Sequence, residues 1–195
     1  MHRAIPLGLR VVQPSANIPI QLLTALTILA LAVVMIKNQV YGSSPVTTRY
    51  STFTGGFGMI VSGVGLLSLF VTFIPAIVPI ALDTLAGFLF LGGGIAWAYG
   101  LRQTANCSAG DAMLYNDLLN QGSQQFKDGV GYGVAHPGDS EWDLFHRLRG
   151  NCQRAQADEI LQFISFGIAA GLVALGYLGM KKGWGGRTGA GAYVA

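Results

Sequence analysis

Long apolar runs without charged residues recur along the chain and dominate its pattern. One of them follows Asp83 and continues without a charge as far as Arg102. A helix needs about 20 apolar residues to cross the roughly 30 Å of bilayer hydrocarbon, so each such run is long enough for one span. The pattern predicts an all-α polytopic membrane protein, a four-transmembrane-helix bundle, with spans at about 18–36, 54–73, 81–101 and 160–180.

The second and third spans are separated within one uncharged stretch. Residues 50–82 are too long for a single span, and Pro75 and Pro79 interrupt them. Because proline ends or kinks a helix, we expect a tight turn here and an antiparallel pair of helices. Around the spans, the pattern predicts a lead at 1–17, a long loop at 102–159 and a flexible tail at 181–195.

The composition agrees with a membrane protein and argues against nucleic acid as a partner. Charged residues make up 11% of the chain and hydrophobic residues 51%, whereas an average soluble domain is about 25% charged. The net charge of +3 comes from scattered basic residues, with no run that would follow a phosphate backbone. Four spans place both termini on one face, but five Lys and Arg there against seven on the other face do not fix the orientation.

The only two cysteines, Cys107 and Cys152, both fall in the long predicted loop. If this loop faces an oxidising compartment, a disulfide would tie the ends of the third and fourth spans together. If it faces the cytosol, the two thiols stay unpaired. Asn106 begins an Asn-Cys-Ser sequon, which is weak support for glycosylation beside the membrane.

Small residues on the predicted spans indicate where helices pack closely. Gly92, Ala96 and Gly100 recur at every fourth position of the third span. Gly167 and Gly171 form a GxxxG pattern in the fourth span. Small side chains let the backbones of neighbouring membrane helices approach each other, so we expect both sets at helix interfaces, within one chain or between copies of it.

Asp83 is the acid at the start of the third span. An ionised carboxylate in hydrocarbon costs about 3 kcal/mol, so Asp83 needs an interface position or a partner. One interpretation is a helix cap that accepts hydrogen bonds from backbone N–H groups. The other is an ion pair with a basic residue on the same face, namely Lys181, Lys182 or Arg10. Such a pair would fix how spans three and four meet, and Asp83→Asn would then disturb assembly.

Residues between the cysteines show helical patterns of their own. Ser140 followed by Asp143 is a capping-box variant that predicts the start of a helix. Trp142, Phe145 and Leu148 recur at every third residue and suggest one apolar face. This face either packs onto the ends of the spans or meets another subunit or the outer leaflet.

Motifs for catalysis are absent from the sequence. It has no Cys-x-x-Cys, GxSxG or HExxH motif and no phosphate-cradling glycine loop. His136 and His146 have no acid or thiol at metal-ligand spacing. Gln162 and Ser165, one turn apart in the fourth span, are expected to bond to a neighbouring helix rather than to line a pathway. We therefore expect no enzyme activity, no cofactor and no metal.

Two segments of the chain resemble a known family. They run from Ala81 to Cys107, ending in GLRQTANC, and from Asn151 to Met180, beginning NCQRAQADEILQFIS. The residues that carry the resemblance in this four-span frame are Asp83, Cys107, Cys152, Arg154 and Ala155. They resemble the fungal non-classical export proteins, which are MARVEL-like membrane proteins. The loop between the cysteines is longer here than the family pattern.

The resemblance implies a plasma-membrane tetraspan with both termini in the cytoplasm and the 102–159 loop outside the cell. It also implies association with eisosomes, which are furrow-like lipid microdomains, together with sphingolipid sensing and unconventional secretion. We therefore expect a non-enzymatic organiser of membrane lipids, whose partners are sphingolipids or sterols, copies of itself or other membrane proteins. Two alternatives remain: a small channel or transporter subunit, and an intramembrane enzyme of the thiol-redox or lipid-modifying kind.

Overall fold

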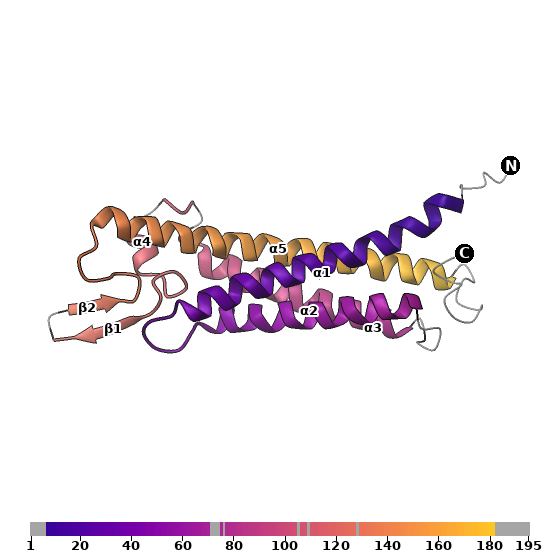
Figure 1. Cartoon of the computed structure of the whole chain (residues 1–195), viewed down its shortest axis with the longest axis horizontal. Coiled ribbons are helices and arrows are strands. Elements are labelled where there is room, and N and C mark those ends of the chain that lie inside the picture. Colours follow the sequence, from indigo (N-terminus) through magenta and orange to yellow (C-terminus); the bar gives the residue numbers. More distant parts are fainter. Residues whose placement is uncertain are drawn as a thin grey trace.

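The computed structural model describes residues 7–70, 75, 77–104, 106–108, 110–127 and 129–181. Four long helices and a small cap make up this part of the chain (Figure 1). The long helices are α1 (Leu7–Lys37), α2 (Val46–Phe70), α3 (Ile77–Leu101) and α5 (Glu141–Lys181). The cap contains the short helix α4 (Gly110–Leu114) and the antiparallel strands β1 (Ser123–Phe126) and β2 (Gly129–Tyr132).

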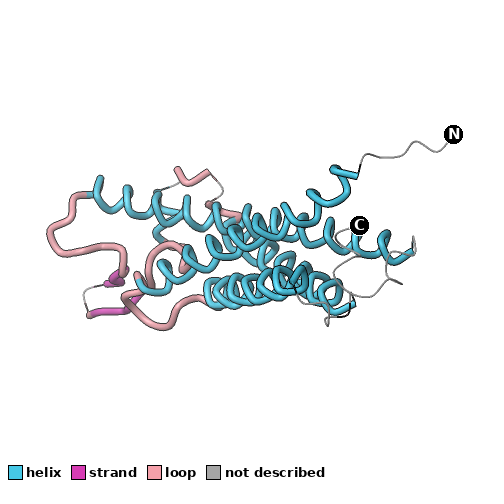
Figure 2. Tube along the Cα trace, turned by 45° about the vertical axis from the view of Figure 1, so that its right-hand side comes forward, coloured by secondary structure: helices cyan, strands magenta, loops and turns pink. Residues whose placement is uncertain are grey.

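The four long helices form a closed ring in which each helix packs mainly against two neighbours. Helix α1 packs on α2, α2 on α3, α3 on α5 and α5 on α1. They run up and down, so that α1 starts and α5 ends at one end of the bundle, whereas α4 and the hairpin lie at the opposite end (Figure 1, Figure 2). All four are long and apolar enough to cross a membrane. The predicted four-span, predominantly helical membrane fold is therefore confirmed.

The last helix begins much earlier than the predicted fourth span. Instead of a loop at 102–159 and a span at 160–180, α5 runs for 41 residues from Glu141, a length of about 60 Å. The predicted capping box starts it: the Asp143 N–H donates to Ser140 Oγ at 3.3 Å, and the Ser140 N–H donates to Asp143 Oδ2 at 3.2 Å. Charged residues limit the part of a helix that lies in hydrocarbon but do not end the helix, so α5 extends beyond the bilayer.

The other helices also extend past the predicted spans. Helix α2 begins at Val46 rather than at 54, directly after Pro45, whose carbonyl accepts the Arg49 N–H at 3.2 Å. Helix α3 begins before residue 81 and carries Pro79 in its first turn, where proline is tolerated. Turn residues, rather than the ends of the apolar run, set these boundaries. Residues 1–6 of the predicted lead and 182–195 of the predicted tail lie outside the described residues.

Two apolar clusters hold the molecule together. The inner cluster lies among α1, α2 and α3 and consists of Ala25, Ile28, Val61, Ala86 and Phe90. The outer cluster joins the cap to the ends of the long helices, and its largest members include Met35, Trp97, Leu101, Met113, Leu119 and Leu148. The long loop is therefore a packed cap on the bundle rather than a free connection.

The hairpin in this cap was not predicted from the sequence. Its register pairs Ser123 with Tyr132 and Phe126 with Gly129, which leaves a two-residue turn. Gly129 is the first residue of β2 and has a φ of 141°, a backbone conformation that favours glycine. The Asp-Gly dipeptide at positions 128 and 129 of the sequence, which is common in hairpin connections, was the available signal for the hairpin.

The closest helix contacts form at other glycines than those predicted. A Cβ added at Gly55 would lie 2.7 Å from the backbone nitrogen of Leu29, so α1 and α2 touch backbone to backbone. A Cβ at Gly167 or Gly171 would meet no atom within 4 Å. The predicted GxxxG pair therefore points away from the bundle, because α5 turns its Ala169 side inward.

The stripe predicted on the third span does not face α5: a Cβ at Gly92 would lie 3.2 Å from the Tyr50 hydroxyl of α2, and one at Gly100 would overlap the Leu118 side chain of the cap. Gly92 is exposed, and Ala96 and Gly100 are half-buried. The buried glycines of α3 are Gly87, Gly93 and Gly94, and all three face α5. A helix turns by about 100° per residue, so a shift of one position moves the contact to another face.

Gly55→Ala is expected to lower the free energy of unfolding by about 1–3 kcal/mol. The added Cβ would overlap the Leu29 backbone, and a helix backbone cannot move aside as a side chain can. Gly171→Ala is the matched control, since the same change there meets open space within the chain. Thermal unfolding of the purified full-length protein in detergent micelles compares the two. Wild-type stability for Gly55→Ala would contradict the close α1–α2 contact.

Candidate functional site

A network of hydrogen-bonded polar side chains lies inside the bundle. Asp158 on α5 is fully buried, and its two carboxylate oxygens lie 2.8 and 2.7 Å from the Ser51 hydroxyl of α2, which donates to them. The Gln162 amide, one turn further along α5, donates to Ser51 Oγ at 3.1 Å and to Thr54 Oγ1 at 3.0 Å. Four buried polar side chains thus join α2 to α5.

The other two long helices reach the same stretch of α5. A Cβ added at Gly93 of α3 would lie 2.5 Å from Gln162 Oε1, so the α3 backbone lies directly against the Gln162 amide. The Ser165 hydroxyl, a further turn along, donates to Thr24 Oγ1 of α1 at 3.1 Å. The prediction that Gln162 and Ser165 bond to a neighbouring helix is confirmed, and all four long helices meet along this part of α5.

Asp158 has no basic partner within the part of the chain that the structure describes, and its hydrogen bonds come from a hydroxyl and an amide. Acids buried among membrane spans are costly and therefore mark candidate functional sites. Sequence reasoning missed Asp158, because it placed this residue in the long loop. The available signal was the spacing from Asp158 to Gln162, which puts both side chains on one helical face.

Asp83 lies inside α3, six residues after the helix begins, and so it does not occupy the cap position. Its Oδ1 atom accepts a hydrogen bond at 3.4 Å from the side-chain amide of Gln21, which is buried on α1. No ion pair joins Asp83 to Lys181. The side chain of Arg10 and the whole of Lys182 lie outside the described residues. The contact that the structure shows therefore links α3 to α1 and not to α5.

A disulfide joins Cys107, just after α3, to Cys152 in α5. The two Cα atoms are 5.6 Å apart, a usual separation for such a bridge. Both cysteines are buried in the outer apolar cluster, and no free cysteine occurs among the described residues. The bridge fastens the cap ends of α3 and α5 together. Asn106, the residue of the sequon, is exposed beside it.

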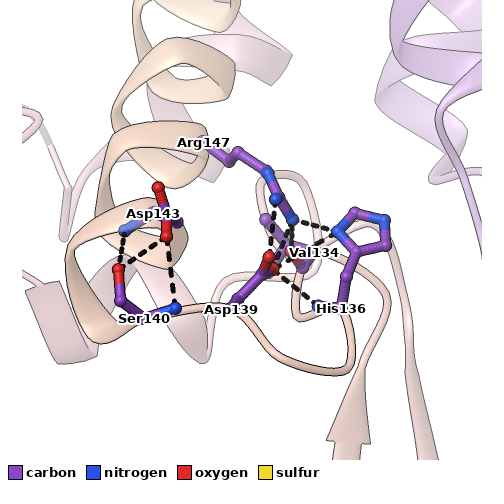
Figure 3. A network of polar contacts seen from close by, with 6 residues as sticks. All are labelled: Val134, His136, Asp139, Ser140, Asp143 and Arg147. Atoms are coloured by element: carbon purple, nitrogen blue, oxygen red, sulfur yellow. Dashed lines mark hydrogen bonds and ion pairs between the residues drawn. The ribbon is translucent and has the colours of Figure 1, made fainter.

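A second polar network fixes the segment that leads into α5 (Figure 3). The Arg147 guanidinium donates to both carboxylate oxygens of Asp139, at 2.5 and 2.8 Å, and to the Val134 carbonyl at 3.2 Å. It also contacts the His136 ring, and the His136 N–H donates to Asp139 at 2.8 Å. The hydrogen bond from Arg147 is the main reason that the pKa of Asp139 lies below its ordinary value of 3.8.

The contribution of Asp139 to the stability of this segment is expected to depend on pH. Because its folded-state pKa is lowered, the contribution is present above the unfolded value of 3.8 and is lost as the pH falls through the folded value. Hydrogen exchange of residues 134–140 should therefore be faster below about pH 3 than at pH 7 after correction for intrinsic rates. In Asp139→Asn the segment should exchange fast at both pH values. Equal protection of this variant and the wild type at pH 7 would contradict a stabilising role for the Asp139–Arg147 pair.

The predicted apolar face of the cap is divided in the structure. Leu148 is fully buried, and Phe145 packs partly against the outer cluster. Trp142 is 67% exposed and stacks on the His146 ring with 4.4 Å between centroids. Steps of three residues advance by about 300° rather than a full turn, so three such positions do not share one face. Only the later two residues pack onto the bundle.

The arrangement of polar groups supports a structural role for the network. Hydrogen bonds join α5 to α1 and α2, and the α3 backbone lies against Gln162. No group of three or more His, Cys, Asp or Glu side chains that could hold a metal ion occurs among the described residues.

No curated protein and no solved structure gives a significant match to this chain. One family model does match: it is described as MARVEL, membrane-associating domain, and it covers residues 3–175. The chain therefore belongs to the MARVEL family of membrane-associating proteins.

Proposed function

We propose that this protein is a non-enzymatic tetraspan that organises lipid microdomains of the plasma membrane. The observation that carries the proposal is a polar network enclosed within the bundle, combined with an outer surface of large apolar side chains. Ser51, Thr54, Asp158 and Gln162 bond to one another inside the bundle. The outward side chains that would meet lipid are large and apolar, including Leu23, Leu26, Ile60, Leu67, Leu85, Phe88, Ile95, Ile164 and Leu175.

The finer part of the proposal follows the resemblance to the fungal non-classical export proteins. It assigns the protein to eisosome-type, sphingolipid-responsive domains with a role in unconventional secretion. The disulfide supports the corresponding orientation, since such bonds persist in oxidising compartments. The cap would then lie outside the cell, with both termini in the cytoplasm and Asn106 accessible for glycosylation.

Self-association is part of the same proposal. Gly167 and Gly171 lie on an outward face of α5 with open space above them, as a close contact between two copies would need. Sphingolipids, sterols or other membrane proteins are the further partners proposed. Gly167→Leu, which adds bulk without facing any helix of its own chain, would then reduce oligomers without unfolding the monomer.

Live imaging of the protein tagged at its C-terminus, before and after sphingolipid depletion, tests the proposed function. We expect static patches at the cell surface that disperse on depletion. Uniform surface or internal staining that does not respond to depletion would contradict the lipid-responsive role. A single-span membrane protein with the same tag serves as the control for general effects of depletion.

One observation favours a second candidate function, that of a channel or transporter subunit. Asp158 is an acid among membrane spans, a position where transported ions often bind. Reconstitution of the full-length protein in planar bilayers separates the candidates. A conductance that Asp158→Asn abolishes would favour the channel, whereas a silent bilayer with correctly folded protein favours the organiser.

A further inference from the structure

A basic cavity of about 530 Å³ lies at the cap end of the bundle, between the end of α1 and the first half of α5. Its polar lining includes Lys37, Asn38, His146, Arg147, Asn151 and Arg154. Among the described residues, no acidic one lines the cavity. Its volume falls within the range of roughly 300–1,000 Å³ that is usual for small-ligand sites.

Two of the cations in this cavity are not neutralised. Arg147 is paired with Asp139, as Figure 3 shows. Lys37 and Arg154 form no ion pair with any acid in the described ranges of the chain. The cavity therefore carries about two positive charges that a bound anion could balance.

The cavity is held in place by buried contacts. Arg154 Nη1 donates to Asn151 Oδ1 at 3.2 Å. The Asn151 side chain is 6% exposed, and its Nδ2 donates to the Leu119 carbonyl of the cap at 2.9 Å. Asn151 thus orients the Arg154 guanidinium. Asn151 is itself fixed by its bond to Leu119 of the outer cluster, which also contains the disulfide. The Arg154 side chain remains exposed and able to bind.

The position of the cavity relative to the membrane points to the source of the anion. Lys37 is the last residue of the α1 span, so the cavity opens where hydrocarbon gives way to headgroups. On the cytoplasmic and matrix sides of membranes, basic pockets between helices bind the phosphates of lipid headgroups, and the same pairing of charges is available at the headgroup level of either leaflet. A guanidinium and an ammonium together suit a phosphate, because arginine binds it through paired N–H groups and lysine through a compact charge.

We propose that this cavity binds the phosphate of an anionic lipid headgroup in the leaflet on the cap side, with Lys37 and Arg154 as its charged ligands. Asn38 and Asn151 supply neutral hydrogen-bonding groups around the same space. This proposal rests on the proposed function, because it names a class of lipid that the protein would gather. The cap would then have a role in binding, because its residue Leu119 and the disulfide hold the binding residues in position.

Native mass spectrometry of the full-length protein in detergent tests the site with short-chain phosphatidylglycerol and the matching uncharged diacylglycerol. We expect one phosphatidylglycerol bound with clear preference over the uncharged lipid. Lys37→Gln/Arg154→Gln should weaken this binding by at least about tenfold. Arg149→Gln is the matched control, since Arg149 is exposed on the same helix but does not line the cavity, and it should bind as the wild type does.

Three results would overturn the proposal. The first is that the double variant binds phosphatidylglycerol as well as Arg149→Gln does. The second is that the uncharged lipid binds as well as phosphatidylglycerol. The third is that inorganic phosphate binds as tightly as the lipid, which would identify a free anion as the ligand. Lys37 and Arg154 are exposed, and an unchanged unfolding temperature of the double variant confirms that it is folded. Failure here is distinguishable from failure of the proposed function, because dispersal of surface patches on sphingolipid depletion is scored separately in cells.

Discussion

Replacing both Cys107 and Cys152 by alanine is expected to lower the free energy of unfolding by roughly 4 kcal/mol. The bridge closes a loop with a sequence separation of 45 residues, and the chain-entropy model gives this value for a loop of that length. The loss is concentrated at the cap, since both cysteines belong to the outer cluster that holds α4 and the hairpin against α3 and α5. We therefore expect the cap to open well before the spans separate.

Limited trypsin digestion of the protein in micelles locates this effect, because the exposed Lys127 and Arg149 offer cleavage sites in and near the cap. Cleavage should be slow in the oxidised wild type and fast in the double alanine variant. Adding a reductant should make the wild type behave like the variant and leave the variant unchanged. Identical cleavage of oxidised and reduced wild type would contradict a stabilising disulfide.

Asp158→Ala is expected to lower the free energy of unfolding by about 1–3 kcal/mol, which is the cost of leaving buried partners unsatisfied. Ser51 would lose its acceptor, and Gln162 would lose one of its contacts at a point where Gly93 leaves no room for adjustment. Asp158→Asn keeps the shape and one acceptor oxygen, so we expect it to retain most of the stability. The ratio of native to unfolded protein in a denaturing detergent titration measures both variants.

The same pair of variants distinguishes a structural role of Asp158 from a functional one. If the carboxylate acts only as a hydrogen-bond acceptor, Asp158→Asn should assemble and form surface patches like the wild type. Ser51→Ala is the matched control, because it removes the closer donor and leaves Asp158 only the 3.4 Å hydrogen bond from the Gln162 amide. A stable Asp158→Asn that fails to form patches would show that the charge itself is required.

The number and order of the spans could be predicted from the sequence because bilayer thickness imposes a minimum length on apolar runs. The starts of the helices could not, since polar segments continue a helix beyond the membrane wherever a cap such as Ser140 begins it. The same error hid Asp158. Once α5 is known to begin at Glu141, Asp158 lies on the face of α5 that includes Gln162 and Ser165.

Contacts between helices were harder to predict than the helices themselves. A glycine-rich span contains more than one set of small residues spaced four positions apart. The sequence alone does not show which of these sets faces a neighbouring helix. On α5 the predicted Gly167 and Gly171 face outward, whereas on α3 the buried glycines are Gly87, Gly93 and Gly94. Asp83 illustrates the same limit, because its neutral partner Gln21 lies 62 positions away in a helix whose rotation the sequence does not fix.

Giant vesicles containing the purified, labelled protein test most directly whether it gathers particular lipids around itself. The vesicles carry a fluorescent sphingolipid and a fluorescent unsaturated phospholipid, and the ratio of the two dyes is measured inside and outside protein patches. We predict that the sphingolipid is enriched within patches of the wild type. An equal ratio inside and outside patches of correctly folded protein would contradict the claim.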